Sequence, residues 1–419
     1  MAITRVRVKF NGAWTTLSYN SATAHYEGTI TPTSTSIYQS GGYYNLEAEV
    51  TNSTGQTSTL TGTDFPSLRL VVREQISPSL TPVSPPPGYL NTLRPTVVMD
   101  AADEAGGSGI NPGSFSVTVD GEPFPGTSAT AVSGGYRLSF TPEADLSEGP
   151  HEIVFFVSDR DGNQASAAVA YVLDVTPPEL ELTAPDSHRV VDWAEEGISG
   201  LTADAISGPP AVTIRVNGTV RASPAVGDDG RFFAEIPLEI GVNEILVTAI
   251  DGSGLSSARS FVMIRLVTDR TEADVERLQS LFRRGVSNWT EEERTWFATT
   301  RCRRGAYDVL DLNRVTAAME FLDAWMSAYG NDSGYSSARP GTWLPGDGVE
   351  TRQRDRYIAN IAGIRDVFIL PEGTAETPEG WNTIPSANAI ESILVAVDAL
   401  RPLLERSPFV SDEIMCGEE

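Results

Sequence analysis

The residues best suited to binding chemistry lie in one short acidic turn. Asp159, Asp161 and Asn163 place three oxygen-bearing side chains at alternate positions of that turn. Carboxylate and amide oxygens are the ligands that calcium takes, but a complete site needs about six to eight of them. Asp and Asn in turns also cap their own backbone N–H groups, and this interpretation is favoured because the remaining oxygens are not evident. Asp100, Asp103 and Glu104 form a second acidic loop of the same kind.

Catalytic chemistry has little support in the sequence. Lys9 is the only lysine and follows no glycine-rich loop, so neither a phosphate-binding loop nor a Schiff base is expected. The three histidines, His25, His151 and His188, are isolated and lack the spacing of metal ligands. No Gly-x-Ser-x-Gly motif occurs, and no carboxylate pair is marked as that of a glycosidase. We therefore expect a protein that is not an enzyme and that needs no cofactor beyond the candidate calcium ion.

Two other groups of residues are candidates for binding a partner. The Gly- and Pro-rich loop 330–348 contains Tyr335, Trp343 and Leu344. Aromatic side chains in a loop are harder to bury than those in a helix or strand, so we expect an interaction surface here. A basic group in this acidic chain either grips an acidic neighbouring subunit or lies at helix C-termini, where the helix dipole favours cations. The second interpretation is favoured for this group, which consists of Arg301, Arg303 and Arg304.

The acidic turn belongs to a β-pattern that occurs three times. The stretch 152–178 is an alternating apolar run, a polar turn, a second apolar run and a double proline, which is typical of two antiparallel strands and a stiff exit. Each copy of the pattern has an early Asn/Asp-Gly turn and a late Asn/Asp-x-x-Gly turn. These turns begin at Asn11 and Asn52, at Asp120 and Asp159, and at Asn217 and Asp251.

The repeat predicts a mainly β fold of three tandem immunoglobulin-like β-sandwiches, followed by an α-helical domain. We place the sandwiches at residues 1–75, 76–176 and 177–268, and call them modules one, two and three. The Pro-rich stretch 78–87 and the pair Pro177-Pro178 are expected to act as stiff spacers.

After Asp269 the apolar period changes from two to about 3.6 residues, which predicts a helical bundle over 269–419. Capping boxes at Thr271 and Thr290 indicate two helix starts. One stripe of apolar residues predicts a helix over 311–330 whose apolar face packs in a core. A short coiled-coil seam is the alternative interpretation of this stripe. Further helices are expected over 354–368 and from Ser386 until Pro402 kinks or ends the last one.

Composition excludes several classes of partner. The 419 residues carry a net charge of −26, which repels nucleic acid and anionic lipid. No apolar run approaches the ~18 residues of a membrane helix, and the N-terminus lacks a signal-peptide core. The two cysteines, Cys302 and Cys416, do not suggest a disulfide framework. We expect synthesis in the cytosol without export by the general secretory route.

Two resemblances extend this interpretation. Modules two and three resemble bacterial Ig-like domains in the segments 108–110, 117–121, 148–151, 158–163, 174–178, 229–232 and 241–245. The later part resembles tail-associated structural proteins of phages and prophages of Firmicutes-type bacteria. That second resemblance rests on the segments 266–275, 289–293, 305–308, 311–315, 357–360, 387–391 and 412–418. The family's aromatic Trp-Phe-Tyr run near the end is reduced here to Pro408-Phe409-Val410.

The second resemblance implies a structural or adhesive protein of a virion tail or baseplate, assembled in the host cytoplasm. The implied partners are other tail proteins, further copies of the chain in a symmetric oligomer, and a host-surface glycan. The alternatives are a bacterial surface protein that binds carbohydrate, and a glycosidase with Ig-like accessory modules.

Overall fold

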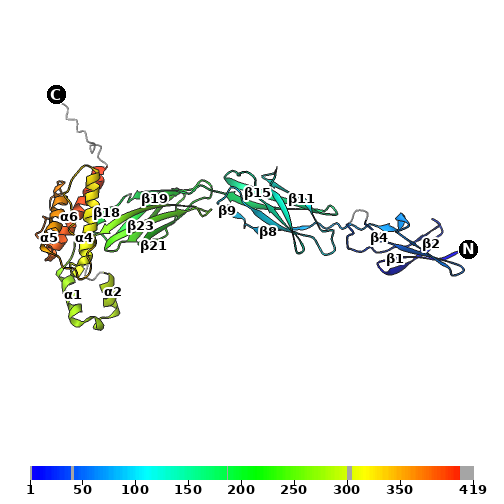
Figure 1. The fold of residues 1–419 in the computed structure, drawn as a ribbon, viewed down its shortest axis with the longest axis horizontal. Coiled ribbons are helices and arrows are strands. Elements are labelled where there is room, and N and C mark those ends of the chain that lie inside the picture. Colours follow the sequence, from blue (N-terminus) through cyan, green and yellow to red (C-terminus); the bar gives the residue numbers. More distant parts are fainter. Residues whose placement is uncertain (1, 39–41, 186, 300–303, 406–419) are drawn as a thin grey trace, which may run out of the picture. The chain divides into compact units, whose positions relative to one another are not determined.

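The computed structural model describes residues 2–38, 42–185, 187–299 and 304–405 (Figure 1). The chain forms two compact units, Met1–Thr176 and Pro177–Glu419, whose boundary falls at the predicted double proline. Strands fill the chain up to Arg265 and helices follow, so the predicted fold class, mainly β with a helical C-terminal part, is confirmed. None of the described helices is long and apolar enough to span a membrane.

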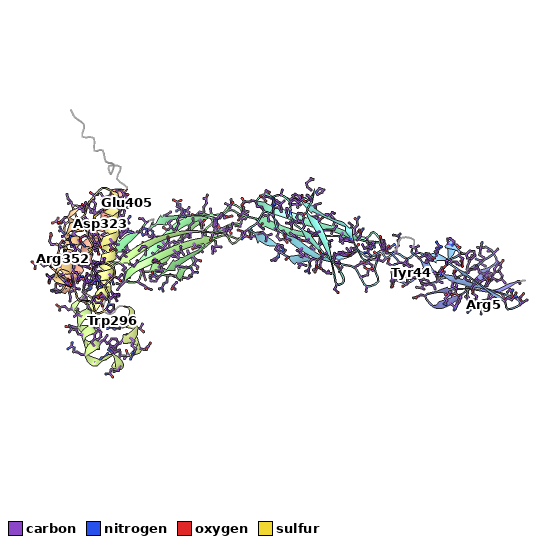
Figure 2. The ribbon with its side chains drawn as sticks, in the orientation of Figure 1. Arg5, Tyr44, Trp296, Asp323, Arg352 and Glu405 are labelled. Carbon is purple, nitrogen blue, oxygen red and sulfur yellow. The ribbon has the colours of Figure 1, made fainter. Side chains whose placement is uncertain are left out.

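Module one differs from the expected sandwich. It has a single five-stranded sheet of order β3-β2-β1-β5-β6 and a separate two-stranded ribbon of β4 and β7. Arg5 lies on the sheet and Tyr44 on the ribbon (Figure 2). The strands are β1 (Ile3–Phe10), β2 (Ala13–Asn20), β3 (His25–Glu27), β4 (Tyr44–Asn45), β5 (Glu47–Asn52), β6 (Thr57–Thr61) and β7 (Arg69–Leu70), with a 3-10 turn, η1 (Pro66–Leu68).

One face of this sheet is charged. Arg7 on β1 pairs with Glu49 on β5 at 2.8 Å, and its guanidinium lies 4.1 Å from the ring centre of Trp14. Ion pairs and a cation–π contact therefore cover this face of the sheet, and Phe10 on the other face contacts Tyr44 of the ribbon. Of the large apolar side chains described in this module, only Phe10 is buried.

Module two is a sandwich with the immunoglobulin strand order. One sheet has the order β13-β14-β10-β8, and the other has the order β12-β11-β15-β16-β9, with β9 parallel to β16. In the letters used for immunoglobulin strands, the first sheet has the order D, E, B, A and the second has the order C′, C, F, G. The first strand is divided into β8 and β9, one in each sheet. The strands are β8 (Ser79–Ser84), β9 (Gly88–Leu90), β10 (Val97–Ala102), β11 (Ile110–Val119), β12 (Glu122–Phe124), β13 (Thr127–Val132), β14 (Gly135–Phe140), β15 (Gly149–Asp159) and β16 (Gln164–Leu173).

The stretch 152–178 supplies β16 and most of β15, the longest antiparallel pair of this module. Alternate residues of β15, such as Ile153 and Phe155, are fully buried between the sheets. The Pro-rich stretch 78–87 is not a spacer, because it forms β8 at the edge of a sheet. An edge strand tolerates proline, since one side of its backbone needs no ladder partner.

Module three repeats this order with one strand fewer. Its sheets are β17-β19-β22 and β18-β24-β23-β20-β21, and β18 runs parallel to β24. The Asn217-Gly218 turn joins β20 to β21, and both residues have positive φ, as that type of hairpin requires. The strands are β17 (Glu179–Ala184), β18 (Arg189–Val191), β19 (Glu195–Ala203), β20 (Ala211–Val216), β21 (Thr219–Ala222), β22 (Arg231–Pro237), β23 (Gly241–Ile250) and β24 (Ser256–Arg265).

Each of the five predicted helical segments is a helix. Both capping boxes form: the Thr271 hydroxyl accepts from the Asp274 N–H, and the Thr290 hydroxyl accepts from the Glu293 N–H. Pro402 lies inside the last helix and does not end it. The helices are α1 (Glu272–Arg284), α2 (Glu291–Thr299), α4 (Val309–Ala328), α5 (Thr351–Asp366) and α6 (Ile384–Glu405), and the 3-10 turn η2 (Val286–Asn288) separates α1 from α2.

The helical part shares one hydrophobic core with module three. Val190, Ile264 and Leu266, from β18, β24 and the segment after it, pack with the buried residues of α4, α5 and α6. The stripe predicted on α4 is buried in this core as far as Met326. The stripe therefore packs against other elements of the same chain, as the core interpretation predicts, and does not form the coiled-coil seam given as the alternative. Tyr329, the last residue of the stripe, follows the helix and is 40% exposed.

Candidate functional site

The acidic turn of module two contacts the segment that leads out of module one. The side chain of Asp161 is 2% exposed and forms an ion pair with Arg73 at 3.5 Å. It also accepts hydrogen bonds from the Ser36 hydroxyl and, at 3.2 Å, from the Glu74 N–H. Asp161 therefore fastens module one and its linker to module two.

The three residues of the predicted calcium set do not converge on one point. Oδ1 of Asp159 accepts from the backbone N–H groups of Gly162 and Asn163, at 2.6 and 2.9 Å. Asn163 directs its amide nitrogen, a donor, toward Asp159 and Glu74. Asp161 binds Ser36 and the linker, so the calcium set Asp159, Asp161 and Asn163 is corrected to the capping turn that the sequence already favoured, and this turn also contacts the neighbouring module.

Asp159 instead meets two acids from other segments. One carboxylate oxygen each from Glu74, Asp103 and Asp159 lie within 4.8 Å of one another. Glu74 accepts from the Ser108 N–H at 2.8 Å, and Oδ2 of Asp103 accepts from the Gly109 N–H at 2.6 Å. We call these three residues with Glu104 the module-two acid cluster.

Part of this cluster has no hydrogen-bond partner. Oδ1 of Asp103 and Oε2 of Glu104 are buried and unpaired among the described residues. A hydrogen bond from its own backbone lowers the pKa of Glu104, but burial and the Asp103 and Glu74 carboxyls outweigh it, so the pKa is raised. Asp100, from the same predicted loop, is separate, because it pairs with Arg137 at 2.8 Å.

Module three contains an equivalent acid pair. Asp204 follows β19 as Asp103 follows β10, and Asp251 follows β23 where Asp159 ends β15. One carboxylate oxygen of Asp204 and one of Asp251 lie within 4.8 Å of each other. A buried serine next to each pair, Ser108 or Ser207, accepts a backbone N–H of the acidic turn.

In this second pair the unpaired oxygen lies on Asp251, the counterpart of Asp159, whereas in module two it lies on Asp103. Oδ1 of Asp251 accepts from the N–H groups of Ser253 and Leu255, at 2.8 and 2.9 Å, while Oδ2 is buried and unpaired among the described residues. Oδ1 of Asp204 accepts from the N–H groups of Ile206 and Ser207, at 2.8 and 2.7 Å. Sequence reasoning missed this pair, although each of the two acids comes directly after a strand, β19 or β23, which was a usable signal.

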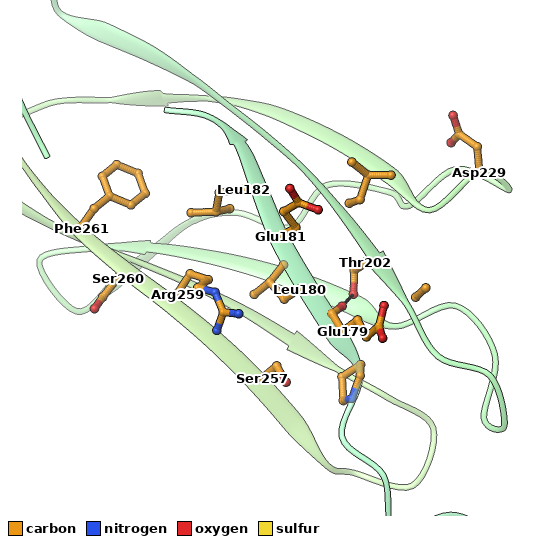
Figure 3. Close-up of a pocket in the computed structure, with 13 residues that line it drawn as sticks. Glu179, Leu180, Glu181, Leu182, Thr202, Asp229, Ser257, Arg259, Ser260 and Phe261 are labelled. Atoms are coloured by element: carbon orange, nitrogen blue, oxygen red, sulfur yellow. Dashed lines mark hydrogen bonds between the residues drawn. The ribbon is translucent and has the colours of Figure 1, made fainter. Parts of the chain in front are cut away.

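A groove of about 720 Å³ runs along module three (Figure 3). It lies between β17 and β24, the strands at one side of the two sheets. Glu179, Glu181 and Arg259 give it charged walls, and Leu180 lies on its floor. Phe261, the only aromatic residue among those that line it, is 4% exposed and belongs to the sandwich core.

The predicted interaction loop of the helical part is only partly exposed. Trp343 is 4% exposed and packs in the shared core, so its assignment to a surface is corrected. Asn313 on α4 holds the backbone of Trp343 with two hydrogen bonds of 2.7 and 2.9 Å, which draws the loop inward. Tyr335 is half-buried and donates to Glu320 at 3.1 Å. Leu344 remains at the surface, with 56% exposure.

The predicted basic group is described only in part. Arg301 and Arg303 lie outside the described residues. Arg304 pairs with Asp269 at 2.8 Å and with Asp274 at 3.4 Å, and these contacts raise its pKa. Its charge therefore binds acids of the same chain.

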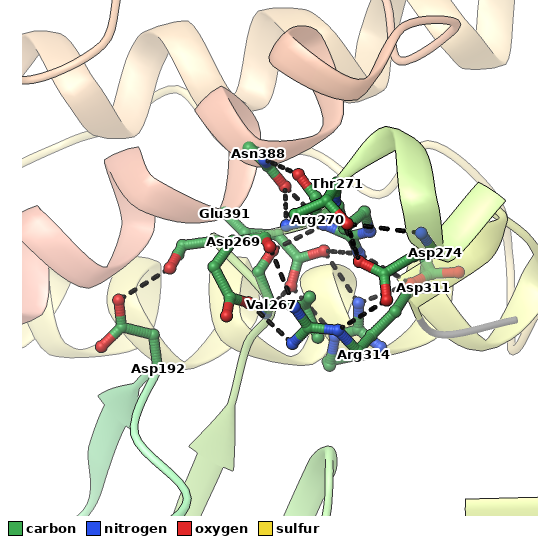
Figure 4. Close-up of polar contacts among 12 residues, drawn as sticks. Asp192, Val267, Asp269, Arg270, Thr271, Asp274, Asp311, Arg314, Asn388 and Glu391 are labelled. Carbon is green, nitrogen blue, oxygen red and sulfur yellow. Dashed lines mark hydrogen bonds and ion pairs between the residues drawn. The ribbon is translucent and has the colours of Figure 1, made fainter. Parts of the chain in front are cut away.

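A buried ion network joins the end of β24 to the helices (Figure 4). Arg314 contacts Glu391 at 2.8 Å, and Arg270 contacts Asp311 at 2.9 Å and also pairs with Glu391. Glu391 further accepts from the Val267 N–H at 2.6 Å. All four charged side chains are at most 5% exposed. The network has a structural role, because two cations and two anions neutralise each other there.

The pKa values of the two carboxylates in this network shift in opposite directions. Burial raises the pKa of Asp311 to about 6, against the influence of Arg314. Burial also acts to raise the pKa of Glu391, but the Arg314 and Arg270 guanidinia outweigh it, so this pKa is lowered. Glu391 is therefore the carboxylate on which both arginines depend.

Comparison with known proteins yields partial likenesses. No family model matches the chain. A stretch of 158 residues is 30% identical to Bacillopeptidase F of Bacillus subtilis (strain 168), covering 35% of this chain and 10% of that protein. The chain thus spans about a tenth of that relative's length.

Solved structures of modular β-proteins also match. The fibronectin(III)-like modules of Clostridium thermocellum CbhA match with 18% identity and a TM-score of 0.32, covering 45% of this chain and 94% of that one. Extracellular domains 3–5 of Drosophila OTK match with 13% identity and a TM-score of 0.29, covering 62% and 85%. The immunoglobulin-like assignment of modules two and three rests on their own strand order.

Proposed function

We propose that this chain is a non-enzymatic spacer and display protein, in which β-modules hold the helical part for docking or recognition. The observation that carries the proposal is the shared core in unit 2, where Leu266 packs with Leu312 and Ile390. A β-module fused in this way to a helical part cannot swing against it. In unit 1, Asp161 fastens module one to module two. Both features suit a protein that carries a binding surface at a fixed place.

We further propose that the chain is a structural or adhesive part of a phage tail or baseplate. The resemblance of residues 266–315 to tail-associated proteins supports this assignment. Symmetric self-association and a host-surface glycan are part of the same proposal. Leu344 and the other exposed residues of the loop 330–348 are the proposed contact surface.

Immunogold electron microscopy of virions tests the assignment. Antibodies against unit 2 should label tail ends, and sedimentation of the purified chain should show a discrete oligomer. Label that is absent from virions and present on bacterial cells would overturn the virion proposal.

A bacterial surface protein that binds carbohydrate is the second candidate. The groove between β17 and β24 and the local match to a bacterial protein favour it. Glycan-array binding that is lost in Arg259→Ala, without loss of stability, would support this candidate. Release of product from a polysaccharide would instead indicate the glycosidase alternative.

A further inference from the structure

Module one has a single sheet where modules two and three each have two. Its five-stranded sheet is accompanied only by the two-stranded ribbon of β4 and β7. Phe10 and Ala48 are the only buried apolar side chains among the described residues of this module, whereas modules two and three each have a continuous apolar core. An apolar sheet face needs a second layer to cover it, so module one is incomplete as a single copy.

The register of the strands defines the face that lacks a cover. Val6 on β1 lies opposite Leu17 on β2 and Val50 on β5, and side chains of directly opposed residues point to the same side. All three are only half-buried. Tyr19 points to this side as Leu17 does, and it lies opposite Tyr26 with the ring centres 5.3 Å apart. We call Val6, Leu17, Tyr19, Tyr26 and Val50 the open face.

The open face is uncharged, because the charged residues of β1 and β5 point to the opposite side. There Arg5 and Arg7 both pair with Glu49, so the charges of that side neutralise each other. Tyr19 is the most exposed member of the open face, with 56% exposure. Tyrosine with few charged neighbours is typical of the centre of a protein–protein interface.

The distribution of charge along the chain indicates which partner covers the open face. Residues 1–75 contain five basic and five acidic residues, so the whole net charge of −26 belongs to residues 76–419. Two copies of the later part repel each other, whereas two copies of module one do not. Module one is therefore the part of the chain at which two copies can meet with the least electrostatic cost.

We infer that the open face of module one packs against the open face of a second copy, so that two single sheets form one β-sandwich. Two sheets pack face to face about 10 Å apart, and their side chains fill the space between them. A two-fold contact of this kind uses the same residues of both copies. The sandwich that was expected within module one then forms between two copies. The inference rests on the self-association within the proposed function, and it names a contact surface for it other than the loop 330–348.

Sedimentation velocity of the full chain between about 1 and 100 µM tests the inference, because a dimer dissociates on dilution. We expect the mass to rise with concentration from 45.0 kDa toward twice that value. Raising NaCl from about 0.1 to about 0.5 M should strengthen the dimer, because salt screens the repulsion between the acidic parts and leaves an apolar contact intact.

Two outcomes of this experiment would overturn the inference: a chain that stays monomeric at the highest concentration, and a dimer that salt dissociates. Neither outcome bears on the labelling of tail ends by antibodies against unit 2. Failure of this inference is therefore distinguishable from failure of the virion assignment.

Alanine variants on β2 separate the open face from the opposite face. Tyr19 and Thr16 are both exposed, and Thr16 lies opposite Arg7 on the charged side. Y19A should weaken the dimer at least about 30-fold, the loss expected for a central side chain of an interface. T16A is the matched control and should dimerise as the wild type does. Equal dimerisation of the two variants would overturn the inference.

Two further variants cover the remaining outcomes. L344A changes the loop 330–348, and loss of the dimer in L344A with retention in Y19A would place the contact in the helical part and overturn the inference. Circular dichroism shows whether each variant is folded. If Y19A does not fold, S58D tests the same face, since Ser58 on β6 is exposed and lies opposite Val50. A wild-type dimer in S58D would overturn the inference, because a buried unpaired charge is not tolerated in such a contact.

Discussion

At the scale of residues, the structure depends on carboxylates whose partners come from distant parts of the chain. Glu391 on α6 is the clearest case, because it binds Arg270, Arg314 and the Val267 N–H. Desolvated charges of this kind are stable only while each has its counterion. Removing one of these charges leaves its partners buried without a counterion, which destabilises the folded state.

Glu391→Gln should lower the free energy of unfolding of unit 2 by about 3–5 kcal/mol, because two buried guanidinia would share Asp311 alone. The lowered pKa of Glu391 means that its stabilisation is present above the unfolded value of 4.5 and is lost as the pH falls below it. The difference in the free energy of unfolding between wild type and variant should therefore become smaller below that pH. Urea unfolding at several pH values measures this difference. The exposed-site variant Glu276→Gln is the control and should change stability by at most about 0.5 kcal/mol.

At the scale of elements, the spacing of the apolar residues along a helix or strand decided which of its faces is buried. Helix α4 buries Leu312, Val315, Met319, Leu322 and Met326, at the spacing that the sequence shows. The same helix carries Asp311 and Arg314 of the ion network near its start. One face of α4 thus holds both the apolar and the ionic fastening of unit 2.

Leu322→Ala should destabilise unit 2 by about 2–5 kcal/mol, because Leu322 is fully buried and its removal leaves a cavity. Ser327→Ala, on the exposed side of the same helix, is the matched control and should stay within about 0.5 kcal/mol. Tryptophan fluorescence during urea unfolding provides the measurement. Equal effects of the two substitutions would contradict the assignment of the buried face.

At the scale of the whole molecule, the four predicted segments form two compact units. Module three and the helices belong to one unit because Val190, Ile264 and Leu266 are covered by helices. Arg401 on α6 adds a hydrogen bond to Ser187 of 3.1 Å. We therefore expect module three and the helical part to unfold together.

A fragment of residues 177–268 should aggregate or fail to fold, since its three covered apolar residues would face water. A fragment of residues 177–405 should be folded and show a single thermal transition. Size-exclusion chromatography and circular dichroism distinguish the two. A stable monomer from the shorter fragment would refute the shared core.

The sequence by itself determined the local structure of most of the chain. Alternation and Asn/Asp-Gly turns located the β-modules, and the 3.6-residue period with Thr271 and Thr290 located the helices. These signals are readable because each element depends mainly on its own residues. Module one was the exception, since its apolar alternation located the strands but did not reveal that they form a single sheet with a separate ribbon.

Only the tertiary structure decided which side chains meet. Asp159 and Asp161 are two residues apart, yet one faces Asp103 and the other Ser36, because neighbouring residues beyond a strand end point in different directions. Trp343 looked exposed in a loop until Asn313, 30 residues away, fixed it in the core. The acid pairs join residues 56 and 47 positions apart, and no local pattern encodes such a distance. They are neighbours because the two sheets of each sandwich bring the ends of those strands together.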